Sequence, residues 1–104
     1  MDSKKMEGIT GKFPNYEVSI KVISQENICT VGHKVGDEWV INGKDCQWKA
    51  PGICMFALAS IFPTLQMMMY GGSFPWEPDS ETALVACPDP RNPAVFELKR
   101  TGKV

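Results

Sequence analysis

The sequence has no excess of charge of either sign. Its 104 residues include 11 lysines and arginines and 12 aspartates and glutamates, which gives a net charge of −1. A protein that binds nucleic acid by neutralising phosphates needs a lysine- and arginine-rich face, so this class is disfavoured. Internal repeats, low-complexity tracts and glycine-rich motifs of the G-x-G-x-x-G or P-loop type are also missing. A single globular domain with one core is the class that these absences leave.

The chain also lacks an apolar leader, because Met1–Lys12 is polar and charged. Its most apolar segment, Ile53–Tyr70, contains Pro63, Thr64 and Gln66. The segment lies at the short end of the roughly 17–25 residues that a membrane-spanning helix needs. We therefore expect a buried helix, no membrane association and a cytoplasmic location. In that compartment cysteines are expected to be thiols rather than disulfides.

Four segments have the composition and the period of two that are typical of strands. Gly36-Asp37 before the second segment predicts a tight turn, since glycine tolerates positive φ and aspartate bonds nearby backbone. Proline-rich sequence between the last two segments predicts an antiparallel hairpin. We expect a flexible arm over residues 1–14 and a single domain over residues 15–104. The predicted strands span residues 16–22, 38–41, 82–87 and 95–99.

The apolar segment after Pro51-Gly52 has helical spacing, and proline is tolerated near a helix start. Its apolar face is so broad that we expect burial on more than one side. Pro63 should kink the helix or split it in two, and Gly71-Gly72 should end it in a left-handed turn. The predicted fold is α+β: a small antiparallel sheet of about four strands, with one apolar, proline-kinked helix packed on one face.

The four cysteines do not have the spacing of a structural zinc site, in which paired ligands lie two to four residues apart. Cys29 and His33 are four residues apart and could bind a metal from one turn. Cys54 and Cys87 would have to join them from distant elements. The alternative is that Cys54 and Cys87 are small buried residues of a helix and a strand, as unpaired cysteines often are.

A reactive thiol is the third interpretation of the cysteines. It needs a pKa lowered by a helix N-terminus or a cationic neighbour. Cys54 is the best placed, because it follows Pro51-Gly52 at the predicted helix start. His33, the single histidine, would be its base. The alternative for His33 is an ordinary surface or hydrogen-bonded residue.

A second candidate site follows the helix, where a double glycine precedes Phe-Pro-Trp. This segment could line a flat aromatic pocket with acidic residues at its rim. The alternative is that Phe74 and Trp76 fold back over one end of the core. The residues of this predicted ligand pocket are Tyr70, Phe74, Trp76 and Glu77.

Five spaced motifs occur along the chain: Cys29-x3-His33-x2-Gly36-Asp37, Gly52-Ile53-Cys54-x2-Ala57, Tyr70-Gly71-Gly72-Ser73-Phe74-Pro75-Trp76, Ala86-Cys87-Pro88-Asp89 and Asn92-Pro93-Ala94-Val95-Phe96-Glu97. Together they resemble the TIGR04076 family, small prokaryotic proteins of about ninety residues with no assigned activity. The resemblance covers nearly everything from Tyr16 to Arg100. It implies an anaerobe-associated prokaryotic cytoplasmic protein in which the positions of Cys29, Cys54 and Cys87 recur.

The leading functional hypothesis is an accessory protein that holds a metal ion, zinc or iron, or a cofactor through Cys29, Cys54 and Cys87, with His33 as a further candidate ligand. A small thiol-dependent enzyme is the second hypothesis, with Cys54 as the reactive thiol, His33 as its base and the aromatic loop around the substrate. A homo-oligomeric interaction module without catalysis is the third. A homodimer is the expected assembly, and no other protein partner is indicated.

Overall fold

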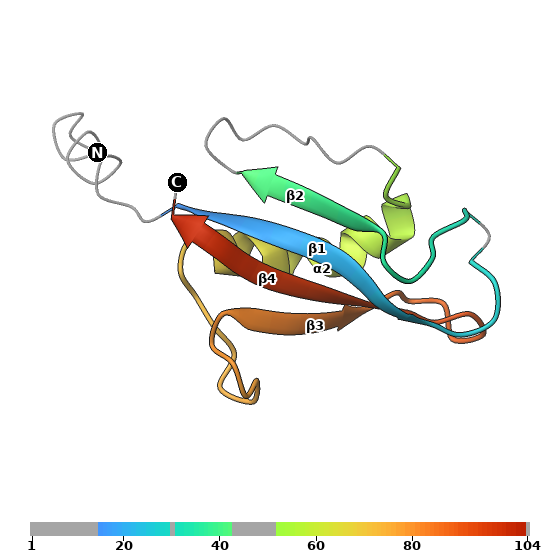
Figure 1. Ribbon diagram of the computed structural model, residues 1–104. Coiled ribbons are helices and arrows are strands. Elements are labelled where there is room, and N and C mark those ends of the chain that lie inside the picture. Colours follow the sequence, from blue (N-terminus) through green and yellow to red (C-terminus); the bar gives the residue numbers. More distant parts are fainter. Residues whose placement is uncertain (1–14, 30, 43–51, 104) are drawn as a thin grey trace, which may run out of the picture.

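The computed structural model describes residues 15–29, 31–42 and 52–103 of the chain. Four strands form one antiparallel sheet in the order β2-β1-β4-β3, and one helix lies against it (Figure 1). The predicted α+β class is therefore confirmed. The arm predicted over residues 1–14 falls outside the described residues. The elements are β1 (Tyr16–Gln25), β2 (Glu38–Asn42), α2 (Met55–Met69), β3 (Thr82–Ala86) and β4 (Ala94–Lys103).

Strand β1 lies in the middle of the sheet. Its Ile20 pairs with Trp39 of β2 on one side and with Leu98 of β4 on the other. Successive side chains of a strand point to opposite faces, and Val18, Ile20 and Val22 are fully buried on the same face. The alternation of apolar and polar residues in this strand therefore arises because only one of its two faces is buried.

The strand is longer than predicted because a β-bulge absorbs the break in its alternation. The sequence predicts that the strand ends at Val22, because Ile23 interrupts the alternation of apolar and polar residues. The register against β4 shifts between Val22 and Ser24, so that Ile23 is the extra residue, and pairing resumes up to Gln25. A bulge of this kind adds one residue to one strand and leaves the ladder on either side intact.

Strands β3 and β4 form the predicted hairpin. Thr82 pairs with Lys99 and Ala86 with Val95. The amide of Cys87 then donates to the carbonyl of Ala94 at 2.8 Å, which closes the connecting loop at its base. Cys87 is thereby fixed immediately after β3.

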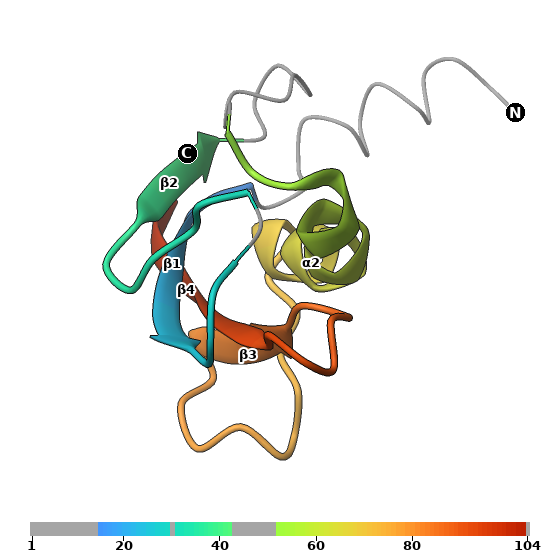
Figure 2. The ribbon, with the colours of Figure 1, turned by 90° about the vertical axis from the view of Figure 1, so that its right-hand side faces the viewer.

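Helix α2 packs on one face of the sheet, which curves around it (Figure 2). Residues three or four positions apart share one face of a helix, and those of α2 that are fully buried have this spacing. The rest of the buried core comes from the sheet, mainly from β1 and β4. The buried residues of α2 are Ala57, Ile61, Leu65 and Met68.

Two expectations for the helix are settled by its exposure and its ends. Burial on more than one side is wrong: Met55 is 72% and Phe56 66% exposed, because the sheet covers only one face of α2 and no second layer is present among the described residues. The predicted left-handed stop is confirmed, since Gly71 has a φ of 90° and the Gly72 amide donates to the Met67 carbonyl at 2.9 Å. Pro63 lies inside one continuous helix and does not split it. A kink at Pro63 stays a prediction.

Candidate functional site

Three segments that are far apart in sequence meet at one end of the sheet, on the right of Figure 1: the β1–β2 loop, the start of α2 and the β3–β4 loop. They enclose a pocket of about 350 Å³. A volume of this size is within the roughly 300–1,000 Å³ of small-molecule sites. Its lining residues are Cys29, Val31, His33, Cys54, Phe56, Cys87, Pro88, Asp89, Pro90, Asn92 and Ala94.

Hydrogen bonds join two of these segments to each other. The Glu26 amide donates to the Pro93 carbonyl at 3.0 Å. The Gln25 side-chain amide donates to the Asn92 carbonyl at 3.0 Å, and the Asn27 side-chain amide to the Arg91 carbonyl at 2.5 Å. The β1–β2 loop, which carries Cys29, is therefore held against the β3–β4 loop, which follows Cys87.

The β1–β2 loop re-enters the sheet through the predicted Gly-Asp turn. Gly36 has a φ of 99°, a left-handed conformation that glycine adopts without strain. The Asp37 carboxylate accepts a hydrogen bond from the Lys34 amide at 3.1 Å. The Gly36 amide donates to the Val22 carbonyl of β1 at 2.9 Å. This turn fixes the chain just after His33.

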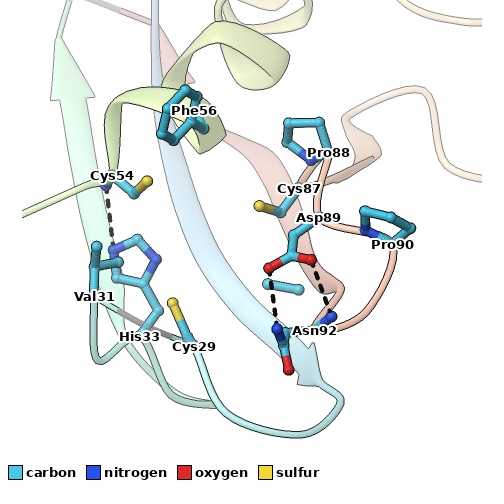
Figure 3. Close-up of a pocket in the computed structure, with 11 residues that line it drawn as sticks. Cys29, Val31, His33, Cys54, Phe56, Cys87, Pro88, Asp89, Pro90 and Asn92 are labelled. Carbon is cyan, nitrogen blue, oxygen red and sulfur yellow. Dashed lines mark hydrogen bonds between the residues drawn. The ribbon is translucent and has the colours of Figure 1, made fainter.

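His33 is only 7% exposed and joins the β1–β2 loop to the start of α2. Its Nε2 lies 2.9 Å from the Gly52 carbonyl oxygen and 3.4 Å from the Cys54 amide nitrogen. The Gly52 carbonyl can only accept, so the 2.9 Å contact requires Nε2 to donate, whereas the hydrogen bond from the Cys54 amide (Figure 3) requires Nε2 to accept. The two bonds belong to different tautomers, and we take the one with the shorter contact, in which Nε2 donates to Gly52. The other nitrogen, Nδ1, then carries a lone pair. In Figure 3 this nitrogen is turned toward the pocket.

Aromatic rings hold the imidazole in place. The His33 ring is edge-on to Trp39, with centroids 5.4 Å apart, and to Phe96, with centroids 6.1 Å apart. Edge-to-face contacts of this length are favourable. The histidine is therefore a fixed part of the pocket wall: the surface alternative for it is wrong, whereas the hydrogen-bonded alternative also describes it.

Cys54 is the residue immediately before α2. Its backbone is extended, with φ −58° and ψ 137°, and its side chain does not cap the helix. The sulfur points into the pocket (Figure 3). The same residue packs partly against the hydrophobic core. Cys54 is therefore both a partly buried packing residue, as one interpretation of the sequence has it, and a residue of the pocket, as the other has it.

Cys87 enters the pocket from the opposite side (Figure 3). Burial raises the pKa of its thiol, while a hydrogen bond from the Asp89 amide acts in the opposite direction. The nearby thiols of Cys54 and Cys29 and the Asp89 carboxylate raise this pKa further, because each opposes a second negative charge. Together these effects favour the neutral Cys87 thiol.

The β3–β4 loop is stiffened by the Asp89 carboxylate. This group accepts hydrogen bonds from the amides of Arg91 at 3.0 Å and Asn92 at 3.3 Å, and from the Asn92 side chain at 3.2 Å. These bonds, led by that of Arg91, lower the pKa of Asp89. The carboxylate stays ionised at neutral pH and keeps a negative charge at the pocket wall.

All four candidate metal ligands thus line one pocket. Cys29, Cys54 and Cys87 are thiols that form no disulfide with one another. Within residues 15–29, 31–42 and 52–103, however, no three histidine, cysteine or acidic side chains are grouped closely enough to hold one metal ion. The donors surround a cavity and do not converge on a point. Cys46 lies outside the described residues.

The predicted aromatic pocket is elsewhere. Tyr70, Phe74, Trp76 and Glu77 do not line the thiol pocket. They follow the C-terminal end of α2, whereas Cys54 precedes its N-terminal end. A helix of 15 residues is about 22 Å long. The structure therefore does not bring the aromatic loop to the Cys54 thiol.

Within that loop Phe74 and Trp76 behave differently. Their rings are stacked, 4.4 Å apart and inclined by 14°. Phe74 packs against the core, whereas Trp76 is 71% exposed. The Glu77 carboxylate accepts a hydrogen bond from the Leu84 amide at 2.9 Å and so joins the loop to β3. The core-covering alternative thus describes Phe74 but not Trp76.

The sequence did not predict seven of the residues that line the pocket, namely Val31, Phe56, Pro88, Asp89, Pro90, Asn92 and Ala94. The proximity of Asp89 and Asn92 to Cys87 in the loop Pro88–Pro93 was an available signal. No signal marked Phe56, which is apolar like its helical neighbours.

Comparisons with known proteins give no relative for this chain: no family model matches it, and neither a curated protein nor a solved structure does so significantly. In the described part of the chain, no helix has the length and apolarity needed to cross a membrane.

Proposed function

We propose that this protein is a small cytoplasmic metal-binding accessory protein that holds a metal ion or metal cluster in the pocket of Cys29, Cys54 and Cys87. The observation that carries the proposal is the meeting of these three thiols, from three separate segments, around one cavity. Thiolates are soft ligands that favour zinc and iron–sulfur clusters over magnesium or calcium. The proposal includes membership of the TIGR04076 family, on the motifs that resemble it.

His33 supports the proposal as a further ligand. A metal-binding histidine usually donates its other ring N–H to a backbone carbonyl or a carboxylate, which fixes the tautomer and the ring orientation. The 2.9 Å contact from His33 Nε2 to the Gly52 carbonyl has this form and leaves Nδ1 for a ligand. This contact joins the His33 ring to the Gly52 backbone, so it does not depend on any cysteine side chain.

Electrostatics supports the proposal as well. Burial raises the pKa of Cys87, and the nearby thiols and the Asp89 carboxylate raise it further because each opposes a second negative charge. A bound cation reverses this balance, because metal ligands must be deprotonated and the metal compensates their charge. Binding therefore releases protons and strengthens as the pH rises.

Elemental analysis of anaerobically purified protein tests the proposal. The reference is a Cys46→Ser variant, which leaves Cys29, Cys54 and Cys87 as the only cysteines. We expect zinc or iron in stoichiometric amount, and a loss of about tenfold or more when any one of the three is also replaced by Ser or Ala. Substoichiometric metal that does not change in these variants contradicts the proposal. Circular dichroism of each variant separates loss of metal from loss of fold.

A small thiol-dependent enzyme is the second candidate, favoured by the position of Cys54 before α2 and by the volume of the pocket. Such an enzyme would use His33 and the pocket wall, because the aromatic loop lies at the other end of the helix. The same samples separate the two functions. The enzyme would hold no stoichiometric metal, and Cys54 would react with a midpoint below the pH of about 8.5 of a free thiol.

A further inference from the structure

The pocket is large for a single ion. Its volume of about 350 Å³ compares with the roughly 30 Å³ that one water molecule occupies in the liquid. A zinc ion lies about 2.3 Å from each sulfur ligand, which brings the ligand sulfurs within about 4 Å of one another. No three donors of the described residues are grouped in this way. The wall therefore has the donor types of a metal site but not the close grouping that a single ion needs.

We propose, on the basis of the metal-binding function above, that the ligand of this pocket is an iron–sulfur cluster of the [4Fe–4S] type rather than a single ion. Cys29, Cys54 and Cys87 each bind a different iron, and the fourth iron faces His33. Cysteine thiolates are the usual ligands of such clusters. Because each thiolate has its own iron, the three sulfurs attach on different sides of the cluster and need not touch.

His33 is suited to the fourth position. Histidine replaces cysteine on one iron of some clusters and raises the reduction potential. The ring is held by Gly52, Trp39 and Phe96 with Nδ1 toward the pocket (Figure 3). It can therefore bind the fourth iron or leave that iron to an external thiolate, without a change in the other three ligands.

The pocket wall also suits a cluster. The Asp89 amide donates a hydrogen bond to the Cys87 sulfur, and hydrogen bonds to the ligand sulfurs are one of the means by which proteins set cluster potentials. Phe56, Val31, Pro88 and Pro90 supply apolar surface around the thiols. These four side chains are themselves exposed, so the wall is apolar but open to solvent.

Loading is a ligand exchange without change of oxidation state. A preformed [4Fe–4S] cluster carrying four small thiolates gives up three of them to the protein. Each of the three cysteines loses its thiol proton to a departing thiolate, which leaves as the thiol. The fourth thiolate stays on the cluster or is replaced by His33 Nδ1.

The test loads the Cys46→Ser variant anaerobically with the preformed [4Fe–4S] mercaptoethanol complex. We expect about four iron and four sulfide per chain after gel filtration, and an electron paramagnetic resonance signal of a reduced cluster after dithionite. Cys29→Ala, Cys54→Ala and Cys87→Ala, each made in this variant, should each lower the bound iron about tenfold or more. His33→Ala should keep the cluster: a changed spectrum or potential shows that Nδ1 binds the fourth iron, and an unchanged one shows that this iron keeps the external thiolate.

The possible failures are distinguishable. One zinc or cobalt per chain with no cluster overturns the cluster and leaves the metal-binding function standing. Neither metal nor cluster overturns both. A cluster that forms in the wild type but is lost in Cys46→Ser overturns the inference, since it does not then depend on the three pocket cysteines alone. Retention of the metal-free circular dichroism spectrum by each alanine variant excludes misfolding as the cause of a loss.

Discussion

At the scale of single residues, Cys87 is the thiol whose protonation responds most clearly to the pocket. Burial raises its pKa, and the thiols of Cys54 and Cys29 and the Asp89 carboxylate act in the same direction. We expect the pH midpoint of Cys87 alkylation by iodoacetamide in the metal-free protein to lie above the roughly 8.5 of a free thiol. Mass spectrometry of the Cys87 peptide across pH gives the midpoint. Ionisation sets the pH of the midpoint, whereas poor access to the thiol lowers the rate of alkylation at every pH.

Cys54→Ser is the matched control for this measurement. It removes one neighbouring negative charge and should lower the Cys87 midpoint, whereas a midpoint at or below 8.5 in the unsubstituted protein would contradict the expectation. Linkage gives the matching change in stability. Because the folded state raises this pKa, the neutral thiol contributes its full stability below the unfolded pKa. That contribution is lost as the pH rises through the folded value.

The sequence predicted which side chains meet at the pocket, but not how they are spaced around it. Cys29, Cys54, Cys87 and His33 were candidates because of their residue types, and the pocket contains all four. Their spacing around a cavity, which disfavours a single ion, depends on how two loops and a helix start pack. Such contacts are long-range in sequence and leave no local pattern.

At the scale of elements, Arg100 of β4 closes the C-terminal end of α2. Its guanidinium donates to the carbonyls of Met68 at 2.8 Å and Gly72 at 2.7 Å, and to that of Ser80 at 2.7 Å. Its Nε forms an ion pair with the Glu81 carboxylate at 2.7 Å. The last carbonyls of a helix have no partner within it and carry partial negative charge. The buried guanidinium of Arg100 supplies hydrogen-bond donors and a positive charge at this helix end.

We expect Arg100→Met to lower the free energy of unfolding by about 2–4 kcal/mol, because the Gly72 and Ser80 carbonyls lose this donor at about 1–3 kcal/mol each before water compensates, whereas the Met68 carbonyl keeps the Gly71 amide. The loss of unfolding free energy in Arg100→Lys should be smaller than in Arg100→Met, since an ammonium keeps the charge but not the planar set of donors of the guanidinium. Urea unfolding measures both. Arg91→Met is the control, because Arg91 is exposed and should change stability by no more than about 0.5 kcal/mol. Equal losses in Arg91→Met and Arg100→Met would contradict this role.

The strands and the helix end could be predicted from the sequence where a single local residue pattern determines them. The period of two in β1 and the glycine after α2 each have a local physical cause, and both predictions hold. Arg100 was missed although it continues the inward alternation of Phe96 and Leu98. The predicted strand ended at residue 99, and arginine is rarely buried without partners. Its partners come from the α2–β3 loop and the end of α2, which the sequence does not place.

At the scale of the whole molecule, the surface of α2 that faces away from the sheet has no charged side chain. Met55 and Phe56 lie on it near the pocket, and Tyr70 at the far end is 49% exposed. A strip about 22 Å long and 10 Å wide covers only a few hundred Å², less than the roughly 800 Å² per partner of a standard interface. The homodimer expected from the sequence should therefore be weak and dependent on concentration.

Ala59→Arg tests this association, because Ala59 is exposed in the middle of α2 and a charge there would face its copy across the interface. Light scattering of the unsubstituted protein should show a mass that rises from monomer toward dimer with concentration, and Ala59→Arg should keep the monomer mass throughout. Leu84→Arg is the matched control, since Leu84 is exposed on the opposite face of the sheet and its replacement should leave the rise intact. A monomer mass at every concentration would rule out the homodimer. Dimers lost equally in both variants would place the contact elsewhere than α2.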